Sequence, residues 1–191
     1  MLLFVGYQRL VANRQINCLE GIGAVLGDED LWRMQNGYAL ASEEDLRMAA
    51  RHLRSTGPGE ISDLRRRLRV GIHRETEVTL PGAGHTDGQV YISALPVVYS
   101  AAGTWATFAR LVLGAAYEAT LRAGIRNARQ TGNRAVYLTL PGGGAFGSRS
   151  EWIISAIRRA FDICQDWPPD VAIVSYGRPG LDVSRLVSDW S

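Results

Sequence analysis

The sequence predicts an α/β protein in which helices cover a mixed, mostly parallel sheet. From residue 89 onward, apolar segments alternate with amphipathic ones in the order strand, helix, strand, helix, strand. Short right-handed crossovers between such elements imply parallel strands. The chain has 191 residues, of which 46% are hydrophobic, and this is enough for one domain with a substantial core.

The first 68 residues predict shorter elements. These are a strand over 2–7, a helix over 16–26, a segment over 31–40 that fits either a strand or a turn, and helices over 42–53 and 61–68. Ser42 is the expected N-cap of its helix because Glu43, Glu44 and Asp45 follow in the first turn.

The α/β core is expected over residues 69–177. It comprises strands over 69–78, 89–98, 135–140 and 171–176, a loop over 81–88, and helices over 104–130 and 150–164. The strand over 89–98 is strongly apolar, as in a central strand that is covered on both faces. We therefore expect residues 1–191 to form a single domain in which residues 1–68 are a divergent or remodelled amino-terminal part.

Charge and composition exclude several classes of function. The chain carries 21 basic residues, all arginine, and 19 acidic residues, for a net charge of +2. The arginines are dispersed apart from a cluster over residues 65–69, so the sequence does not favour specific nucleic-acid binding. No apolar run has the length of a membrane span, and the start of the chain lacks the features of a signal peptide. We expect a cytoplasmic protein with no membrane partner, and the sequence leaves its oligomeric state open.

The cysteines and histidines indicate neither a metal centre nor a disulfide framework. Cys18 and Cys164 are far apart in the sequence and lack metal-ligand neighbours, and the three histidines are scattered. We expect two buried free thiols, no metal and no cofactor.

Residues 138–148 contain the most informative motif, L-T-L-P-G-G-G-A-F-G-S. Ligands bind beyond the carboxyl ends of parallel strands, which is where Gly142–Ser148 is expected. Consecutive backbone N–H groups before a helix form an anion site that suits a phosphate, and Phe146 can lie against a sugar or base. A tight strand-to-helix turn with a packed phenylalanine is the alternative. The motif has neither the P-loop nor the Rossmann spacing.

Three stretches carry a resemblance to a known family. They are V-Y-I-S-A-L-P-V-V-Y at 90–99, E-A-T-L-R-A-G at 118–124 and Y-L-T-L-P-G-G-G-A-F-G at 137–147. Residues 89–177 thereby resemble the carboxyl-terminal half of a macrodomain, and the third stretch is most similar to the poly(ADP-ribose) glycohydrolase branch. The resemblance implies a three-layer macrodomain-like sandwich.

The resemblance also implies a ligand, ADP-ribose or an ADP-ribosylated macromolecule. By this reading the main-chain amides of Gly143, Gly144, Ala145, Phe146 and Gly147 hold the diphosphate. Phe146 packs on the distal ribose, and Tyr99 lines the same cleft. No glycine motif followed by paired glutamates, as in the glycohydrolase branch, precedes residue 89. Residues 17–25 fit an ordinary helix better than a remnant of that motif.

Two functions remain open at this point. In one, the chain binds ADP-ribose or a related NAD-derived nucleotide, either with or without hydrolysis of an ADP-ribosyl (N- or O-glycosidic) linkage. In the other, it is a non-catalytic macrodomain-like interaction module that has lost ligand binding.

Other candidate residues lie outside the glycine motif. Glu75 and Glu77 are two apart on an expected strand, and paired carboxylates can act as acid and base, although a solvated strand edge has the same pattern. In Q-N-G-Y at 35–38, Asn36 and the flanking Gln35 and Tyr38 either contact a ribose or amide or belong to a hairpin turn. Arg149 either meets a phosphate or is a solvated first-turn residue.

Overall fold

The computed structural model describes residues 17–26, 31–35, 38–92, 94–99, 102–167 and 169–190. The strand expected over 2–7 and the candidate residue Asn36 lie outside these ranges. The described elements, in chain order, are α1 (Glu20–Leu26), β1 (Arg33–Gln35), β2 (Tyr38–Leu40), α2 (Glu43–Ser55), α3 (Pro58–Arg66), β3 (Gly71–Glu77), β4 (Thr86–Tyr91), the 3₁₀ turn η1 (Val97–Tyr99), α4 (Ala102–Thr131), β5 (Ala135–Leu138), α5 (Ser150–Cys164), β6 (Asp170–Ile173) and α6 (Leu181–Trp190).

The structure confirms a mixed α/β fold, and the described strands form three two-stranded sheets. β1 pairs with β2 and β3 with β4, both antiparallel, whereas β5 and β6 are parallel and in register from Ala135↔Asp170 to Leu138↔Ile173. A mostly parallel central sheet and a three-layer sandwich are not confirmed. The difference arises at β4, which pairs with its neighbour in the chain, β3, instead of with a strand beyond α4.

The strand expected over 89–98 is shorter than predicted. β4 ends at Tyr91, and η1 begins at Val97 after the buried Leu95 and Pro96. Proline has no N–H group to donate to a strand ladder, so an apolar segment that contains it is not required to continue as a strand. Residues 95–97 fill the core without belonging to a sheet.

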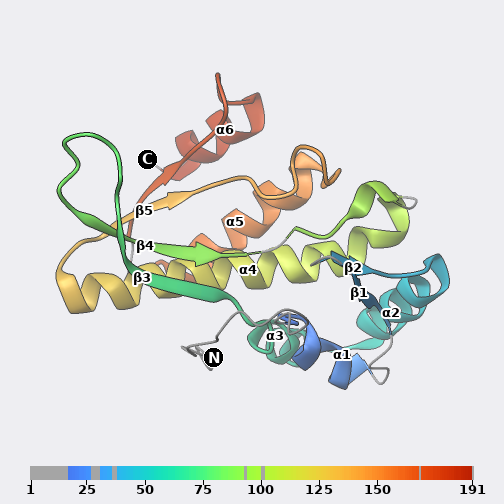
Figure 1. Cartoon of the computed structure of the whole chain (residues 1–191). Helices are drawn as coiled ribbons and strands as arrows, with labels where there is room; N and C mark the ends of the chain where they lie inside the picture. The colour runs from blue at the N-terminus through green and yellow to red at the C-terminus, as the bar shows by residue number, and fades with distance from the viewer. Residues whose placement is uncertain are drawn as a thin grey trace.

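Helix α4 is the centre of the molecule (Figure 1), and α2, α3 and α5 all pack against it. Its middle is buried almost all round, because every described side chain from Leu111 to Ala119 is buried. The sequence predicts one apolar face here, but neighbours on several sides cover more of the helix than one face. Trp105 and Phe108 lie in the same core.

The helix over 42–53 forms as α2, with the expected cap. The side chain of Ser42 accepts a hydrogen bond from the N–H of Asp45, while the carboxylate of Asp45 accepts one from the N–H of Ser42. This reciprocal pair satisfies two backbone donors that the first turn cannot satisfy by itself.

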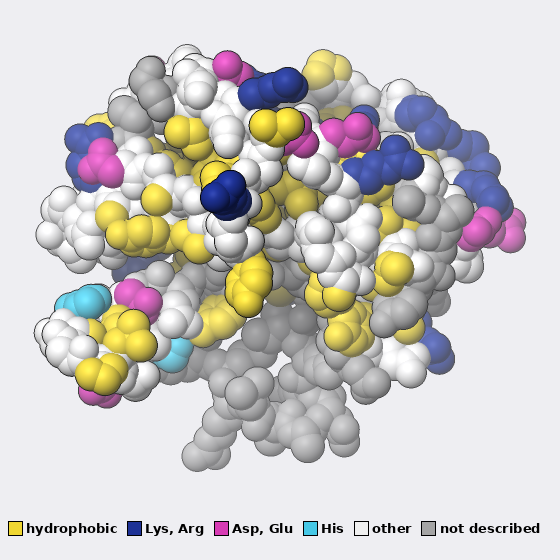
Figure 2. Space-filling view, turned by 90° about the horizontal axis from the view of Figure 1, so that it is seen from above, with side chains coloured by type: hydrophobic (Ala, Val, Ile, Leu, Met, Phe, Trp, Pro, Cys, Tyr) yellow, Lys and Arg dark blue, Asp and Glu magenta, His cyan; other side chains and the backbone are white. Residues whose placement is uncertain are grey.

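Helix α6 was not among the elements expected from the sequence. It buries Val183 and Leu186 and packs against α5, where Trp190 meets Phe161 edge-to-face at 5.3 Å between ring centroids. Figure 2 looks from above onto this side of the molecule, where hydrophobic side chains lie exposed among charged ones. Exposed apolar residues of this part of the chain include Tyr137, Val174 and Leu181.

Candidate functional site

The glycine loop (residues 139–149) connects the end of β5 to the start of α5. Since β5 and β6 are parallel, the loop leaves the carboxyl end of a parallel pair, where ligands bind in α/β proteins. Arg149 is the N-cap residue of α5 and makes no side-chain capping bond. The loop contains no acidic side chain.

Hydrogen bonds within the loop set its shape. The N–H of Gly143 donates to the carbonyl of Leu140 at 3.2 Å, that of Gly147 to Gly144 at 3.1 Å, and that of Ser148 to Gly142 at 2.8 Å. These donors are therefore engaged within the protein.

Three consecutive N–H groups remain, those of Gly144, Ala145 and Phe146, and none of them has an acceptor among the described residues. Gly144 and Ala145 are exposed, and Phe146 is half-buried. The loop thus holds three free backbone donors side by side in a segment whose ends are fixed.

The glycines of the loop differ in what they do. Gly142 and Gly147 have φ angles of +81° and +76°, and a Cβ atom at Gly142 would lie 2.5 Å from the Ser148 Oγ atom. These two glycines are needed by the turn itself. Gly144 has no positive φ, and a Cβ atom there would meet nothing within 4 Å. The fold therefore does not require a glycine at position 144.

Phe146 meets an aromatic residue from the amino-terminal part of the chain. Its ring centroid is 5.8 Å from that of Tyr38 at the start of β2, with an angle of 42° between the rings. The carbonyl of Phe146 accepts a hydrogen bond from the N–H of Val98 in η1 at 3.1 Å. Tyr38 and Val98 both stay exposed, at 39% and 57%. Apolar groups from three distant segments thus meet beside the free amides.

Val98 was not among the predicted site residues, whereas Tyr38 belongs to the Q-N-G-Y cluster that the sequence offered as a contact for a ribose or amide. The sequence signal for Tyr38 is its place beside the Asn-Gly pair, which indicated the hairpin that β1 and β2 form. Tyr99 lies in η1 next to Val98, and its side chain is outside the described part of the structure. Ser148 is buried beneath Gly142, which indicates a packing role.

Arg149 is engaged with its neighbours in α5. Its guanidinium lies 5.7 Å from the ring centroid of the buried Trp152 and 3.8 Å from the Glu151 carboxylate. Arg110 of α4 contacts the same two residues, at 6.0 Å and 3.6 Å. Two guanidinium groups therefore share one carboxylate near the end of the glycine loop, which leaves an excess of positive charge there.

Glu75 and Glu77 are not brought to the glycine loop. Both are exposed in β3, whose carboxyl end lies at the opposite end of the molecule from the β5–α5 connection (Figure 1). A register shift between His73 and Thr76 and a φ of +54° at Glu75 interrupt the alternation of the strand. Glu75 and Glu77 therefore lack the regular same-face spacing that the sequence suggested, although they are two residues apart.

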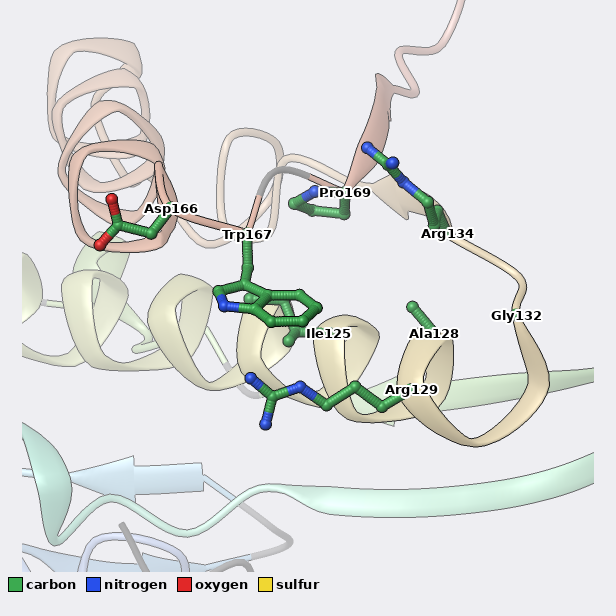
Figure 3. Close-up of a pocket in the computed structure, with 8 residues that line it drawn as sticks. All are labelled: Ile125, Ala128, Arg129, Gly132, Arg134, Asp166, Trp167 and Pro169. Carbon is green, nitrogen blue, oxygen red and sulfur yellow. The ribbon is translucent and has the colours of Figure 1, made fainter.

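A cavity of about 370 Å³ lies at the other end of β5 and β6. Figure 3 shows its aromatic wall, the exposed indole of Trp167, with the guanidinium of Arg129 against one side of the ring. The guanidinium is 4.4 Å from the ring centroid. Arg134 lies on the other side of the cavity and pairs with Asp170 at 3.5 Å. Both guanidinium groups are thus engaged within the protein.

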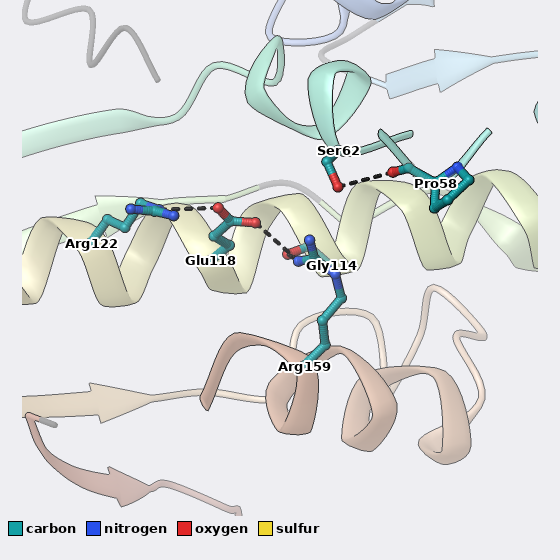
Figure 4. A network of polar contacts seen from close by, with 6 residues as sticks. All are labelled: Pro58, Ser62, Gly114, Glu118, Arg122 and Arg159. Carbon is teal, nitrogen blue, oxygen red and sulfur yellow. Dashed lines mark hydrogen bonds and ion pairs between the residues drawn. The ribbon is translucent and has the colours of Figure 1, made fainter. Parts of the chain in front are cut away.

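The most buried charge of the described chain is Glu118 in α4 (Figure 4). Its carboxylate accepts hydrogen bonds from Arg159 of α5 at 2.9 Å and from Arg122 at 3.0 Å. Burial acts to raise the pKa of Glu118, but these two arginines hold it below its ordinary value. Burial and the nearby Arg159 lower the pKa of Arg65, whose Nε has no acceptor in the described structure. This network joins helices and does not face the glycine loop.

Metal ligands and reactive thiols are two further possible sources of chemistry in the described ranges. No group of three or more His, Cys, Asp or Glu residues there can hold a metal ion. Cys18 and Cys164 are free thiols, and burial raises the pKa of each. Only Cys164 is fully buried. In the same part of the chain, no helix combines the length and apolar character needed to cross a bilayer.

We compared the chain with protein-family models, curated proteins and solved structures, and none of the three comparisons gives a significant match. The functional conclusion therefore depends on the geometry of the glycine loop and on the resemblance of its sequence.

Proposed function

We propose that this protein binds a nucleotide diphosphate through the free amides of Gly144, Ala145 and Phe146, with ADP-ribose as its ligand. The observation that carries the proposal is the run of three unpaired N–H groups in a loop whose ends are held by internal hydrogen bonds. An organised set of donors binds an anion without first losing the entropy of ordering the loop.

Electrostatics support an anionic ligand. The loop precedes α5, whose amino-terminal end carries a partial positive charge. Arg110 and Arg149 add positive charge that Glu151 only partly neutralises. The resemblance of residues 137–147 to the macrodomain loop is the reason for proposing the diphosphate of ADP-ribose as that anion.

The proposal is for binding without hydrolysis. Cleavage of a glycosidic linkage needs a carboxyl group within hydrogen-bonding reach of the reacting atoms. The two predicted carboxylates, Glu75 and Glu77, belong to β3, whose carboxyl end lies at the other end of the molecule from the glycine loop (Figure 1). We expect Glu75→Gln and Glu77→Gln to leave ADP-ribose affinity unchanged, and the wild-type protein to release no ADP-ribose from a modified protein.

Calorimetric titration with ADP-ribose tests the proposal. We expect a dissociation constant in the micromolar range, about −8 kcal/mol. A Cβ atom at Gly144 meets nothing within 4 Å, so the position has room for a side chain. Gly144→Leu is expected to abolish binding, because it adds bulk to the residue that carries the first of the three free amides.

Gly180→Leu is the matched control, because a Cβ atom at this loop glycine also meets nothing within 4 Å. It should bind ADP-ribose as the wild type does. Absence of any binding of ADP-ribose, ADP or pyrophosphate by the wild-type protein would refute the proposal and favour an interaction module without a ligand.

A further inference from the structure

We infer that the β1–β2 hairpin forms the second wall of the ligand site, and that Tyr38 together with Phe146 binds the ring portion of the ligand. The inference rests on the proposed function and specifies its substrate class: a diphosphate that carries a sugar or base, in preference to a free inorganic diphosphate.

The first observation is the position of Tyr38 against the glycine loop. It begins β2, more than a hundred residues before the glycine loop in the chain, yet its ring contacts that of Phe146. Phe146 supplies both a free N–H group and this ring. A ligand held at the amide of Phe146 therefore lies next to the aromatic pair.

The second observation is that Tyr38 is partly exposed to solvent. Tyr38 is 39% exposed and Val98, which also contacts Phe146, is 57% exposed, so a ligand can reach the aromatic pair from solvent. Its hydroxyl has no partner among the described residues. Because the two rings already touch, a ligand ring packs against their solvent side and not between them. Stacking on aromatic side chains contributes about 1–3 kcal/mol per base in nucleic-acid complexes.

Titrations with ADP-ribose, ADP and pyrophosphate separate the ring contact from the diphosphate contact. We expect the wild type to bind ADP-ribose at least tenfold more tightly than pyrophosphate. Tyr38→Ala should weaken ADP-ribose about tenfold and leave pyrophosphate unchanged, while Tyr38→Phe should retain most of the affinity. Tyr91→Ala, which removes an exposed tyrosine from the end of β4, is the matched control and should change neither affinity.

The outcomes distinguish the two proposals. If the wild type binds neither ligand, the proposed function fails, and this inference fails with it. If ADP-ribose and pyrophosphate bind equally, or if Tyr38→Ala binds ADP-ribose as the wild type does, only the role of Tyr38 is refuted. A loss of pyrophosphate binding in Tyr38→Ala would show that Tyr38 holds the loop in shape, and this also overturns the inference.

A measurement on the wild-type protein tests the inference without requiring that a Tyr38 variant folds. Saturation-transfer NMR should show stronger transfer from the protein to sugar or base protons of ADP-ribose when the Tyr38 and Phe146 ring signals are irradiated than when other aromatic signals are. Equal transfer from both sets of signals would contradict the inference.

Discussion

Replacing Gly142 and Gly144 separately with alanine distinguishes the glycine that the fold needs from the one that the ligand needs. At Gly142, φ is +81°, and an L-residue in this region costs about 1–2 kcal/mol. The new Cβ atom would also lie 2.5 Å from the Ser148 Oγ atom and 3.1 Å from the Ala94 Cβ atom. Moving neighbouring atoms to relieve such a clash typically costs about 1–3 kcal/mol. We therefore expect Gly142→Ala to lose about 2–5 kcal/mol of the free energy of unfolding.

Gly144→Ala should behave in the opposite way. Its φ is not positive and its Cβ position is open, so alanine mainly restricts the unfolded chain and stabilises by about 0.4–1 kcal/mol.

Urea denaturation followed by circular dichroism measures both effects. With a slope of about 2 kcal/mol/M, the Gly142→Ala midpoint should fall by about 1–2.5 M, and that of Gly144→Ala should stay equal or rise. Equal midpoints for the two variants, or a destabilised Gly144→Ala, would refute the assignment of roles within the loop.

Three further predictions concern the helices that support the site. Ser42→Ala should cost about 1 kcal/mol in thermal unfolding because it removes the α2 cap, whereas Ser155→Ala in the exposed middle of α5 should cost nothing; equal losses would contradict this. Glu118→Gln should lose about 1–3 kcal/mol at pH 7 because it removes the carboxylate that accepts hydrogen bonds from the half-buried Arg159 and from Arg122. Because the pKa of Glu118 is lowered in the fold, this contribution should be complete above about pH 4.5 and should decline as the pH falls further; a loss that does not change with pH would contradict it. Tyr117 donates a hydrogen bond to the carbonyl of Thr139 at 2.9 Å and burial raises its pKa, so wild-type stability should fall as the pH rises above about 10, and Tyr117→Phe should lose about 1 kcal/mol at pH 7 but lack this alkaline loss; identical alkaline curves would count against that role.

Helices with strong local signals were the best-predicted part of the fold. α5 spans Ser150–Cys164, as expected, and α4 differs from the expected range by only one or two residues at each end. Ser42 is the N-cap of α2. Caps and helical periodicity depend on residues within a few positions of one another, so the sequence alone contains them.

Strand pairing was less predictable because its partners are distant. The parallel arrangement of β5 and β6 is confirmed, but β4 pairs with β3. An apolar run identifies a candidate strand without identifying its neighbour. Helix α6 has the weak signal of a short segment, and it is stabilised by packing against α5.

The place of the glycine loop, between an apolar strand and an amphipathic helix, follows from the sequence because both signals are local. Tertiary packing settles which amides of the loop stay free and which of its glycines serve the turn. It also brings Tyr38 against Phe146 and leaves Glu75 and Glu77 in β3, away from the loop. These facts depend on how segments distant in the chain pack together, and sequence spacing carries no record of such contacts.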